Sequence, residues 1–200
     1  MAAVSPPAAS VQAPVIAADM PAAIAPWLSY IDQAAQRFGV PAAWIVAVMQ
    51  AESRGRTHLN GRQITSRAGA MGLMQLMPAT YQEMARMHGL GADPFDPRDN
   101  ILAGTAYLAQ MRDRFGYPGL FAAYNAGPAR YQAHLDTGAP LPAETRAYIA
   151  TLAASPGQAA MPPAVLSGTR LFFRLDGQGP SAPPPAGLFA PRSELKDEGA

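Results

Sequence analysis

The strongest constraint on the fold is the helical spacing of apolar residues through the middle of the chain, punctuated by glycine and proline. In the first such segment these residues recur at intervals of four and three, which puts them on one face of a helix: Trp27, Ile31, Ala34 and Phe38. Gly39 provides the stop, and Pro41 opens a second helix at its first position. The apolar stripe of this second helix consists of Ile45, Val48 and Met49.

The same signals predict the remaining elements. Asn60-Gly61, within the polar segment 57–66, is a tight-turn signal and indicates a small β-hairpin. Four further helices are marked by their first residues, caps or stops: Pro78 to about Gly89, one capped by Asp96 or Asp99 and ending before Gly116, one ending at Asn125-Ala126-Gly127-Pro128, and one across 143–153. Strands and helices do not alternate, so we predict a compact, mainly α domain over residues 25–153.

The two ends of the chain differ from this middle part in composition. Residues 1–24 and 154–200 are rich in proline with alanine or glycine, and such segments bury too little apolar surface to offset the entropy of ordering them. We therefore expect a flexible leader and a flexible C-terminal tail. Within the tail, TRLFFRLD at 169–176 has the composition of a short strand, which would either pack on the domain or await a partner.

Charge and composition exclude several classes of protein. The net charge is +1 and the basic residues are scattered, which argues against a nucleic-acid-binding surface. The chain has no cysteine, and therefore no disulfide, thiolate nucleophile or zinc-thiolate site. No apolar run is long enough for a transmembrane helix, and no basic residue precedes Arg37, so a secretory signal peptide is not recognisable.

Glu52 is the first candidate for chemistry. It continues the stripe of the second helix, seven residues after Ile45, and so points toward the interior or a cleft wall. A carboxyl group in such a place is costly to ionise, so we expect a raised pKa, as a general acid requires. The alternative is that Glu52 turns out to solvent or pairs with Arg54 or Arg56.

A second clue is the lack of a partner carboxylate nearby. Glycosidases ordinarily use two carboxylates within about 10 Å of each other. The sequence from Ser53 to Gln82 contains no Asp or Glu. This pattern fits a single-acid mechanism in which the substrate supplies its own nucleophile, although a distant residue could fold back.

Two further segments can contribute to a cleft. In SRAGAMGLMQLMPATY, residues 66–81, the glycines give a tight loop and Gln75 places an amide in an apolar run. Met74 and Met77 would be adaptable cleft lining, or core residues, the latter especially for Met77. In AYNAGP, Tyr124 belongs to the cleft or the core, and Asn125 is by itself most simply a helix cap.

The chain resembles the family 1 lytic transglycosylases, which have a goose-type-lysozyme-like catalytic domain of the lysozyme-like α+β superfamily and include enzymes of conjugation and type IV secretion. The resemblance runs from about Ile24 to Leu152 and rests on four motifs in order: ES at 52–53, S-x-x-G-A-x-G-L-M-Q at 66–75, AYNAGP at 123–128 and ETRAYI at 144–149. One departure concerns the loop after ES. Many relatives have Asn-Pro there, whereas this chain reads ESRGRTHLNGR, which leaves the loop shape and subsite details open.

The resemblance implies a cofactor-free lyase that cuts the β-1,4 bond between N-acetylmuramic acid and N-acetylglucosamine in peptidoglycan without water. Glu52 would protonate the leaving oxygen and then accept the proton of the muramoyl 6-hydroxyl, while the 2-acetamido group assists at the anomeric carbon. The resemblance assigns the substrate-binding residues as Ser66, Met74, Gln75, Tyr124, Asn125 and Tyr148. Ser66 would hydrogen-bond Glu52 or the acetamido group.

The resemblance also implies a periplasmic place of action, and we expect a monomer whose tails contact secretion or conjugation components. Two other functions stay open: a muramidase that uses water, and a non-catalytic glycan-binding accessory of a secretion system. A metal site is not expected, because His58, His88 and His134 are isolated. Asp93, Asp96 and Asp99 are spaced for helix capping and not for an EF-hand loop.

Overall fold

The computed structural model describes residues 21–153; residues 1–20 and 154–200, with the predicted strand at 169–176, lie outside the described part. The elements in order are η1 (Ala25–Trp27), α1 (Leu28–Phe38), α2 (Ala42–Glu52), β1 (His58–Leu59), β2 (Arg62–Gln63), α3 (Pro78–His88), α4 (Pro97–Phe115), α5 (Gly119–Ala126), α6 (Pro128–Thr137) and α7 (Ala143–Ala153). The prediction of a mainly helical domain with one small hairpin is confirmed.

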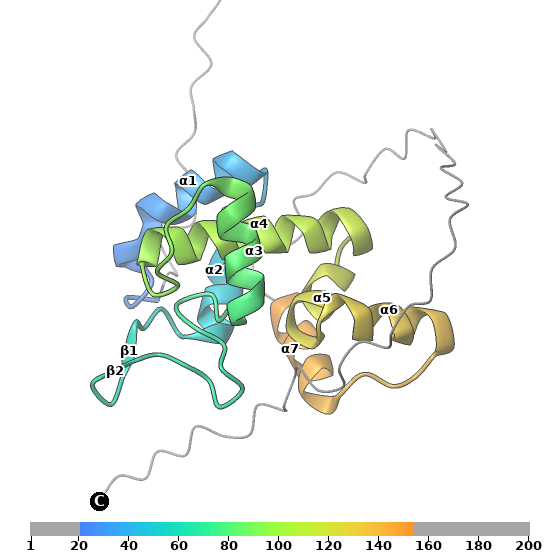
Figure 1. Cartoon of the computed structure of the whole chain (residues 1–200). Coiled ribbons are helices and arrows are strands. Elements are labelled where there is room, and N and C mark those ends of the chain that lie inside the picture. Colours follow the sequence, from blue (N-terminus) through green and yellow to red (C-terminus); the bar gives the residue numbers. More distant parts are fainter. Residues whose placement is uncertain (1–20, 154–200) are drawn as a thin grey trace, which may run out of the picture.

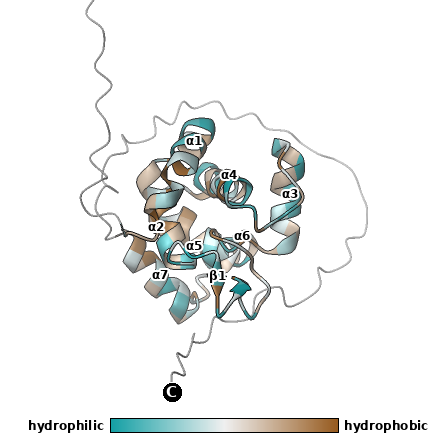
Figure 2. Ribbon diagram, turned by 90° about the vertical axis from the view of Figure 1, so that its left-hand side faces the viewer, coloured by the Kyte–Doolittle hydropathy of each residue, from teal (hydrophilic) through white to brown (hydrophobic). Residues whose placement is uncertain are grey.

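The helix α4 is the centre of the domain. Eleven of its nineteen residues are buried, and α1, α3 and α5 pack around it (Figures 1 and 2). On the far side, α5 contacts α6 and α7, and α2 contacts α1 and α7. One continuous apolar core results. None of the helices among residues 21–153 has the length and apolar character needed to cross a membrane.

The helix ends follow the sequence signals closely. Gly39 and Gly89 close α1 and α3 with φ of 61° and 64°, the left-handed conformation that glycine adopts without a Cβ clash. Asp96 caps α4, where its carboxylate accepts from the backbone N–H of Asp99. Pro41 differs slightly from the prediction, because its extended ψ of 129° makes it the N-cap and the helix begins at Ala42.

The predicted hairpin is present and short. His58 pairs with Gln63, and Leu59 pairs with Arg62, in antiparallel register. The two connecting residues, Asn60 and Gly61, have φ of 50° and 74°. Two successive positive φ values are those of a type I′ turn, which is the reason Asn-Gly signals a hairpin.

The helix α6 is not predicted by the sequence pattern. Gly127-Pro128 indicates the end of a helix, and α5 does end there. Pro128 is also the first residue of the next helix, α6. None of the residues of α6 is buried, so its sequence lacks the apolar stripe that marks the other helices.

Ile24, the last residue of the predicted leader, is fully buried and packs with the core. The indole N–H of Trp27 donates to the Gly55 carbonyl oxygen at 2.9 Å. A Cβ on Gly55 would lie 2.5 Å from the Ala23 carbonyl oxygen. The entry segment is thus packed against the turn that follows α2.

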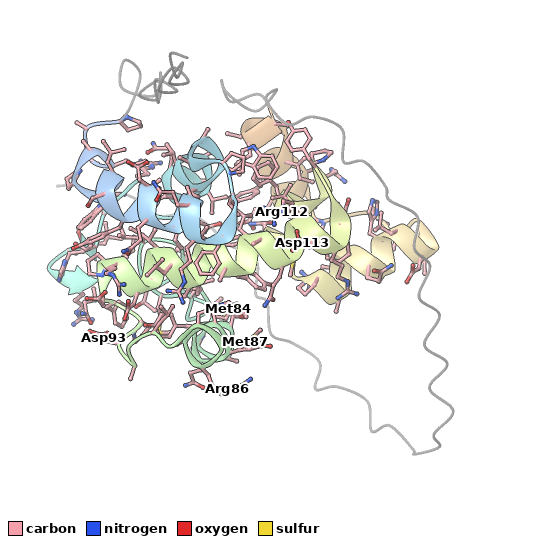
Figure 3. All side chains as sticks on the ribbon, turned by 90° about the horizontal axis from the view of Figure 1, so that it is seen from above. Met84, Arg86, Met87, Asp93, Arg112 and Asp113 are labelled. Carbon is pink, nitrogen blue, oxygen red and sulfur yellow. The ribbon has the colours of Figure 1, made fainter. Side chains whose placement is uncertain are left out.

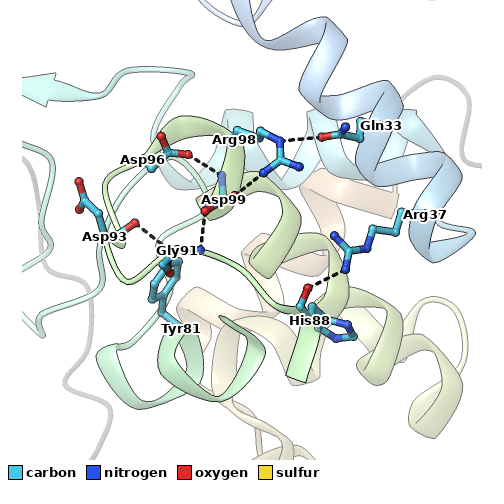
Figure 4. A network of polar contacts seen from close by, with 9 residues as sticks. All are labelled: Gln33, Arg37, Tyr81, His88, Gly91, Asp93, Asp96, Arg98 and Asp99. Atoms are coloured by element: carbon cyan, nitrogen blue, oxygen red, sulfur yellow. Dashed lines mark hydrogen bonds and ion pairs between the residues drawn. The ribbon is translucent and has the colours of Figure 1, made fainter. Parts of the chain in front are cut away.

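The long connection between α3 and α4 is tied down by polar contacts (Figure 4). The Tyr81 hydroxyl lies 3.0 Å from the Gly91 carbonyl oxygen and 2.7 Å from that of Asp93. Asp99 accepts from the Gly91 N–H at 2.6 Å and pairs with Arg98. Burial and the neighbouring carboxylates raise the pKa of Tyr81 to about 12, so its hydroxyl stays a donor.

A surface contact also joins the end of α1 to the last turn of α4. The Arg112 guanidinium, in the last turn of α4, donates to the Gly39 carbonyl oxygen at 2.6 Å and pairs with Asp113. On α3, Met84 is fully buried, whereas Met87 is half exposed and lies with Arg86 on the outer side (Figure 3). The helix α3 is therefore amphipathic in three dimensions.

Candidate active site

Glu52 is the last residue of α2 and is only 9 % exposed. The stripe predicted from Ile45, Val48 and Met49 is buried together with it, which confirms the inward direction and excludes an acid turned out to solvent. Arg54, one of the two candidate pairing partners, is exposed. Helical periodicity alone therefore brings a carboxyl group to the edge of the core.

The turn after Glu52 is held by Ser53. Its hydroxyl donates to the Met49 carbonyl oxygen at 3.3 Å and accepts from the Gly55 N–H at 3.1 Å. The Met49 carbonyl oxygen also accepts from the Ser53 backbone N–H at 3.0 Å, so Ser53 closes the helix through both its backbone and its side chain. Ser53 is 2 % exposed, so it fixes the helix end from inside the protein.

The loop between the hairpin and α3 lies on α4. The Met71 N–H donates to the Leu76 carbonyl oxygen at 2.9 Å, and the Leu76 N–H donates back to Met71 at 3.1 Å. Between them, Gln75 has a φ of 48° and its side-chain amide donates to the Gly72 carbonyl oxygen at 2.8 Å. A non-glycine residue in this region is strained by about 1 kcal/mol, and such strain is common at ligand sites.

Met74 differs from the expectation that it lines the cleft. Its side chain is fully buried, and a Cβ on Gly104 of α4 would lie 2.5 Å from the Met74 Cβ. Met77, for which the sequence favours a core position more strongly, is partly exposed. Met74 can therefore serve the site through its backbone and not through its thioether.

Tyr124 connects this loop to the acid. Its hydroxyl donates to the Met74 carbonyl oxygen at 2.8 Å. Burial raises the pKa of Tyr124 well above its usual range, and the charges of Glu52 and Tyr107 raise it further. The hydroxyl is thus neutral throughout the physiological range, and Glu52, Tyr124 and the Met74 carbonyl group form one polar cluster in the core wall.

Tyr107 is a residue of this site that sequence reasoning misses. Its ring centroid lies 5.3 Å from that of Tyr124. Burial and the charge of Glu83 raise the pKa of Tyr107 to about 12. The only sequence signal is its position in α4, four residues before Met111, and that pattern cannot tell a core tyrosine from one beside an acid.

The remaining predicted residues lie on other elements. The Thr145 hydroxyl of α7 donates to the Asn125 side-chain oxygen at 2.8 Å, which joins α7 to α5. Tyr148 is 8 % exposed in the same helix. The Ser66 hydroxyl oxygen accepts from the Ala70 N–H at 2.9 Å and so shapes the loop before Met71. The fold thus brings Glu52, Tyr124 and Met74 together, and it joins Asn125 to α7.

Comparison with known families decides the class of this domain. A family model described as the transglycosylase SLT domain matches residues 29–139, which is more than half of the chain. The chain belongs to this family. The match covers α1 to α6 and therefore contains Glu52, the 66–76 loop and Tyr124, but ends before α7.

Several curated proteins are similar to this SLT domain. The soluble lytic murein transglycosylase of Escherichia coli K12 is 35 % identical over 107 residues, which is 50 % of this chain and 16 % of that protein. A transglycosylase of Enterobacteria phage PRD1 is 36 % identical over 45 % of this chain and 30 % of its own. Membrane-bound lytic murein transglycosylase C of Histophilus somni is 36 % identical over 44 % of this chain and 25 % of its own length. The chain thus spans less than a third of these relatives.

Solved structures agree with the family assignment. An inactive glutamate-to-glutamine mutant of lytic transglycosylase Slt from Pseudomonas aeruginosa matches 62 % of this chain and 22 % of its own, with a TM-score of 0.55 and 32 % identity. The 70 kDa soluble lytic transglycosylase of Escherichia coli matches 63 % of this chain and 22 % of its own, with a TM-score of 0.54 and 28 % identity. The SLT domain therefore shares the lysozyme-like fold of these enzymes.

Cation-binding groups are dispersed in this SLT domain. Among residues 21–153 no three His, Asp or Glu side chains gather closely enough to hold a metal ion. His88 instead packs edge-on against the ring of Phe38, and burial together with Arg37 lowers its pKa. Asp96 and Asp99 are used for capping and for holding a loop.

Proposed function

We propose that this protein is a peptidoglycan lytic transglycosylase that cleaves the β-1,4 bond between N-acetylmuramic acid and N-acetylglucosamine and leaves 1,6-anhydromuramoyl ends. The observation that carries the proposal is the buried Glu52, whose charge helps to raise the pKa of the buried Tyr124, in a domain of the SLT family. The relatives named above are transglycosylases, and those of Escherichia coli K12 and Histophilus somni are named murein transglycosylases. The Pseudomonas aeruginosa enzyme is inactive as a glutamate-to-glutamine mutant, which supports a mechanism that depends on one glutamate.

In the proposed first step, the Glu52 carboxyl group donates its proton to the glycosidic oxygen as the bond from C1 to that oxygen breaks. The acetamido group of the substrate assists at C1. In the second step, the Glu52 carboxylate takes the proton of the muramoyl 6-hydroxyl while that oxygen forms a bond to C1. Glu52 ends the cycle protonated, so the reaction consumes no water and needs no second carboxylate.

The other site residues are proposed to bind and orient the glycan. Gln75 offers a side-chain amide from the strained loop. The Tyr124 hydroxyl donates its hydrogen bond to the Met74 carbonyl oxygen, so toward the glycan its oxygen can act as an acceptor. Tyr107, Ser66, Asn125 and Tyr148 complete the proposed set. Because the Tyr124 hydroxyl is neutral, it adds no negative charge beside the Glu52 carboxylate during the second step.

The test is digestion of purified peptidoglycan by the full chain, with mass spectrometry of the released fragments. We expect fragments that end in anhydromuramic acid, each one water lighter than a hydrolytic product. Glu52→Gln should release none while melting at a similar temperature, because the amide preserves shape and removes the transferable proton. Fragments with reducing muramic acid ends would instead identify a muramidase and overturn the proposal.

The place of action follows from the substrate, so we propose that the protein works in the periplasm. Fractionation of the native cells with an antibody to the domain tests this, and recovery from the cytoplasm alone would contradict it. Contacts of the tails with a secretion or conjugation apparatus stay a prediction from the sequence. So does the monomeric state, which light scattering of the purified protein would decide.

A further inference from the structure

Asn100 is fully buried in the first turns of α4 and makes three hydrogen bonds to backbone groups of two loops. Its side-chain oxygen accepts from the Met74 N–H at 2.8 Å. Its side-chain nitrogen donates to the Pro94 carbonyl oxygen at 2.8 Å and to that of Met71 at 3.1 Å. Because an N–H only donates and a carbonyl oxygen only accepts, these partners fix the orientation of the amide.

The set of partners requires an asparagine. Aspartate would keep the acceptor for the Met74 N–H but would place a carboxylate oxygen against two carbonyl oxygens. A larger residue has no room, since a Cβ on Gly72 would already lie 2.4 Å from the Asn100 side-chain nitrogen. The amide therefore fills a space bounded by both loops.

One end of this connection is anchored independently. Pro94 belongs to the connection between α3 and α4, which Tyr81 and Asp99 hold through the neighbouring backbone groups (Figure 4). The Asn100 amide, which bonds to Pro94, also bonds to Met71 and Met74 in the other loop. The loop that contains Gln75 is thus fastened to a part of the protein that is itself fixed.

Met74 is held on three sides as a result. Asn100 accepts from its N–H, Gly104 lies against its side chain, and the Tyr124 hydroxyl donates to its carbonyl oxygen. Tyr124 in turn lies within the electrostatic reach of Glu52. A path of hydrogen bonds therefore runs from Asn100 through Met74 to Tyr124, on which the charge of Glu52 acts. The residue after Met74, Gln75, has its left-handed conformation within the same loop.

We propose that Asn100 is a positioning residue for the transglycosylase reaction: its amide holds the Met74 peptide where it orients the Tyr124 hydroxyl and keeps Gln75 in its strained conformation. The inference rests on the proposed function. Asn100 touches no substrate; it acts through Met74. A purely structural asparagine would stabilise the fold without setting the rate of catalysis.

Two variants separate these roles, and each is measured in the full chain. Asn100→Asp keeps the acceptor and removes both donors. Gly104→Ala keeps every polar group but adds a methyl group 2.5 Å from the Met74 Cβ. Thr105→Val is the matched control, because Thr105 is fully buried on the same helix and its hydroxyl donates within that helix, to the Ile101 carbonyl oxygen. Release of anhydro fragments from solubilised glycan strands gives kcat and KM.

We expect Asn100→Asp and Gly104→Ala each to lower kcat by about 10- to 100-fold, because small displacements of a site cost that much. KM should change by less than about threefold, and Thr105→Val should retain kcat. The double variant of Asn100→Asp with Tyr124→Phe should be no slower than the slower single variant, since both act on one path. Multiplied losses, or a folded Asn100→Asp protein with unchanged kcat, would overturn the inference.

A second measurement does not depend on activity. Amide hydrogen exchange should be faster in Asn100→Asp at residues 71–76 and unchanged in the helices. Equal loss of protection throughout the domain would show a structural role only and would also overturn the inference. If the wild-type protein releases no anhydro ends, the proposed function fails, while hydrogen exchange still decides whether Asn100 holds the loop. The two failures are therefore distinguishable.

Discussion

Two carboxylates act on the aromatic pair of the candidate site from different helices. Glu52 of α2 contributes to the raised pKa of Tyr124, and Glu83 of α3 contributes to that of Tyr107. Glu83 is exposed, whereas Glu52 is buried. Glu83 is therefore the residue with which to ask whether a second carboxylate takes part in the reaction.

We expect Glu83→Gln to retain kcat within about twofold, because a transglycosylase needs one acid and an exposed carboxylate is screened by solvent. The measurement is the initial rate of anhydro-fragment release, with Glu52→Gln as the inactive reference. A loss as complete as that of Glu52→Gln would point to two-carboxylate chemistry and to water as the nucleophile.

The Tyr107 hydroxyl predicts a pH dependence of stability. Its pKa is about 12 in the folded protein and about 10 in an unfolded chain, so the unfolded state loses the proton first as pH rises. The contribution of the Tyr107 hydroxyl to the free energy of unfolding is complete below about pH 10. It declines by about 2–3 kcal/mol between about pH 10 and 12. In denaturant titrations, the wild-type free energy of unfolding should approach or fall below that of Tyr107→Phe over this range. A difference that stays constant with pH would contradict this.

Sequence reasoning succeeds for Glu52 because its direction depends on local periodicity, and Ile45 lies two helical turns earlier on the same face. It cannot find Tyr107, because the contact with Tyr124 depends on how α4 and α5 cross. It could not choose between cleft and core for the side chain of Met74, which is fully buried, since side-chain directions in an irregular loop follow from tertiary hydrogen bonds such as those of Asn100.

At the level of elements, two glycines with the same positive φ offer a controlled comparison. Gly61 in the hairpin and Gly72 in the loop on α4 both have a φ of 74°. A Cβ on Gly61 meets nothing within 4 Å, whereas one on Gly72 would overlap Asn100 and the Pro94 carbonyl oxygen. An alanine would have to adopt a positive φ at both positions, and the packing around its methyl group differs.

We expect Gly61→Ala to cost about 1 kcal/mol of unfolding free energy and to leave the cleavage rate unchanged. Gly72→Ala should cost more, about 2–4 kcal/mol, and should lower the rate because the loop must shift. Urea unfolding and the fragment-release assay give both quantities. Equal destabilisation by the two substitutions would mean that the loop accommodates the methyl group without strain.

The elements themselves are mostly predictable because their ends carry local chemistry. Gly39, Gly89 and Asp96 act within one turn of the helix that they close or open. The exception, α6, shows the limit: its first residue Pro128 and its C-cap Gly138 are the usual end signals, but with none of its residues buried no apolar stripe marks a helix between them.

For the whole molecule, the buried Ile24 defines where the folded part must start. We expect the fragment 21–153 to unfold cooperatively and the fragment 25–153 to be less stable by about 2–4 kcal/mol, because removal of a buried isoleucine leaves a cavity beneath η1. Calorimetry of the two fragments measures the difference. Equal melting temperatures would show that the first four of these residues are dispensable, as the predicted boundary after residue 24 implies.

The hydrogen bond from Trp27 to Gly55 gives the entry segment a mechanical role as well. Gly55 is three residues beyond Glu52, so the chain that leads into the domain is fastened to the turn that carries the acid. A tag, surface linkage or fusion partner attached within residues 21–27 would transmit load directly to that turn. Protein engineering on this domain should therefore leave this segment intact and place attachments farther from the acid, for example on the exposed face of α6.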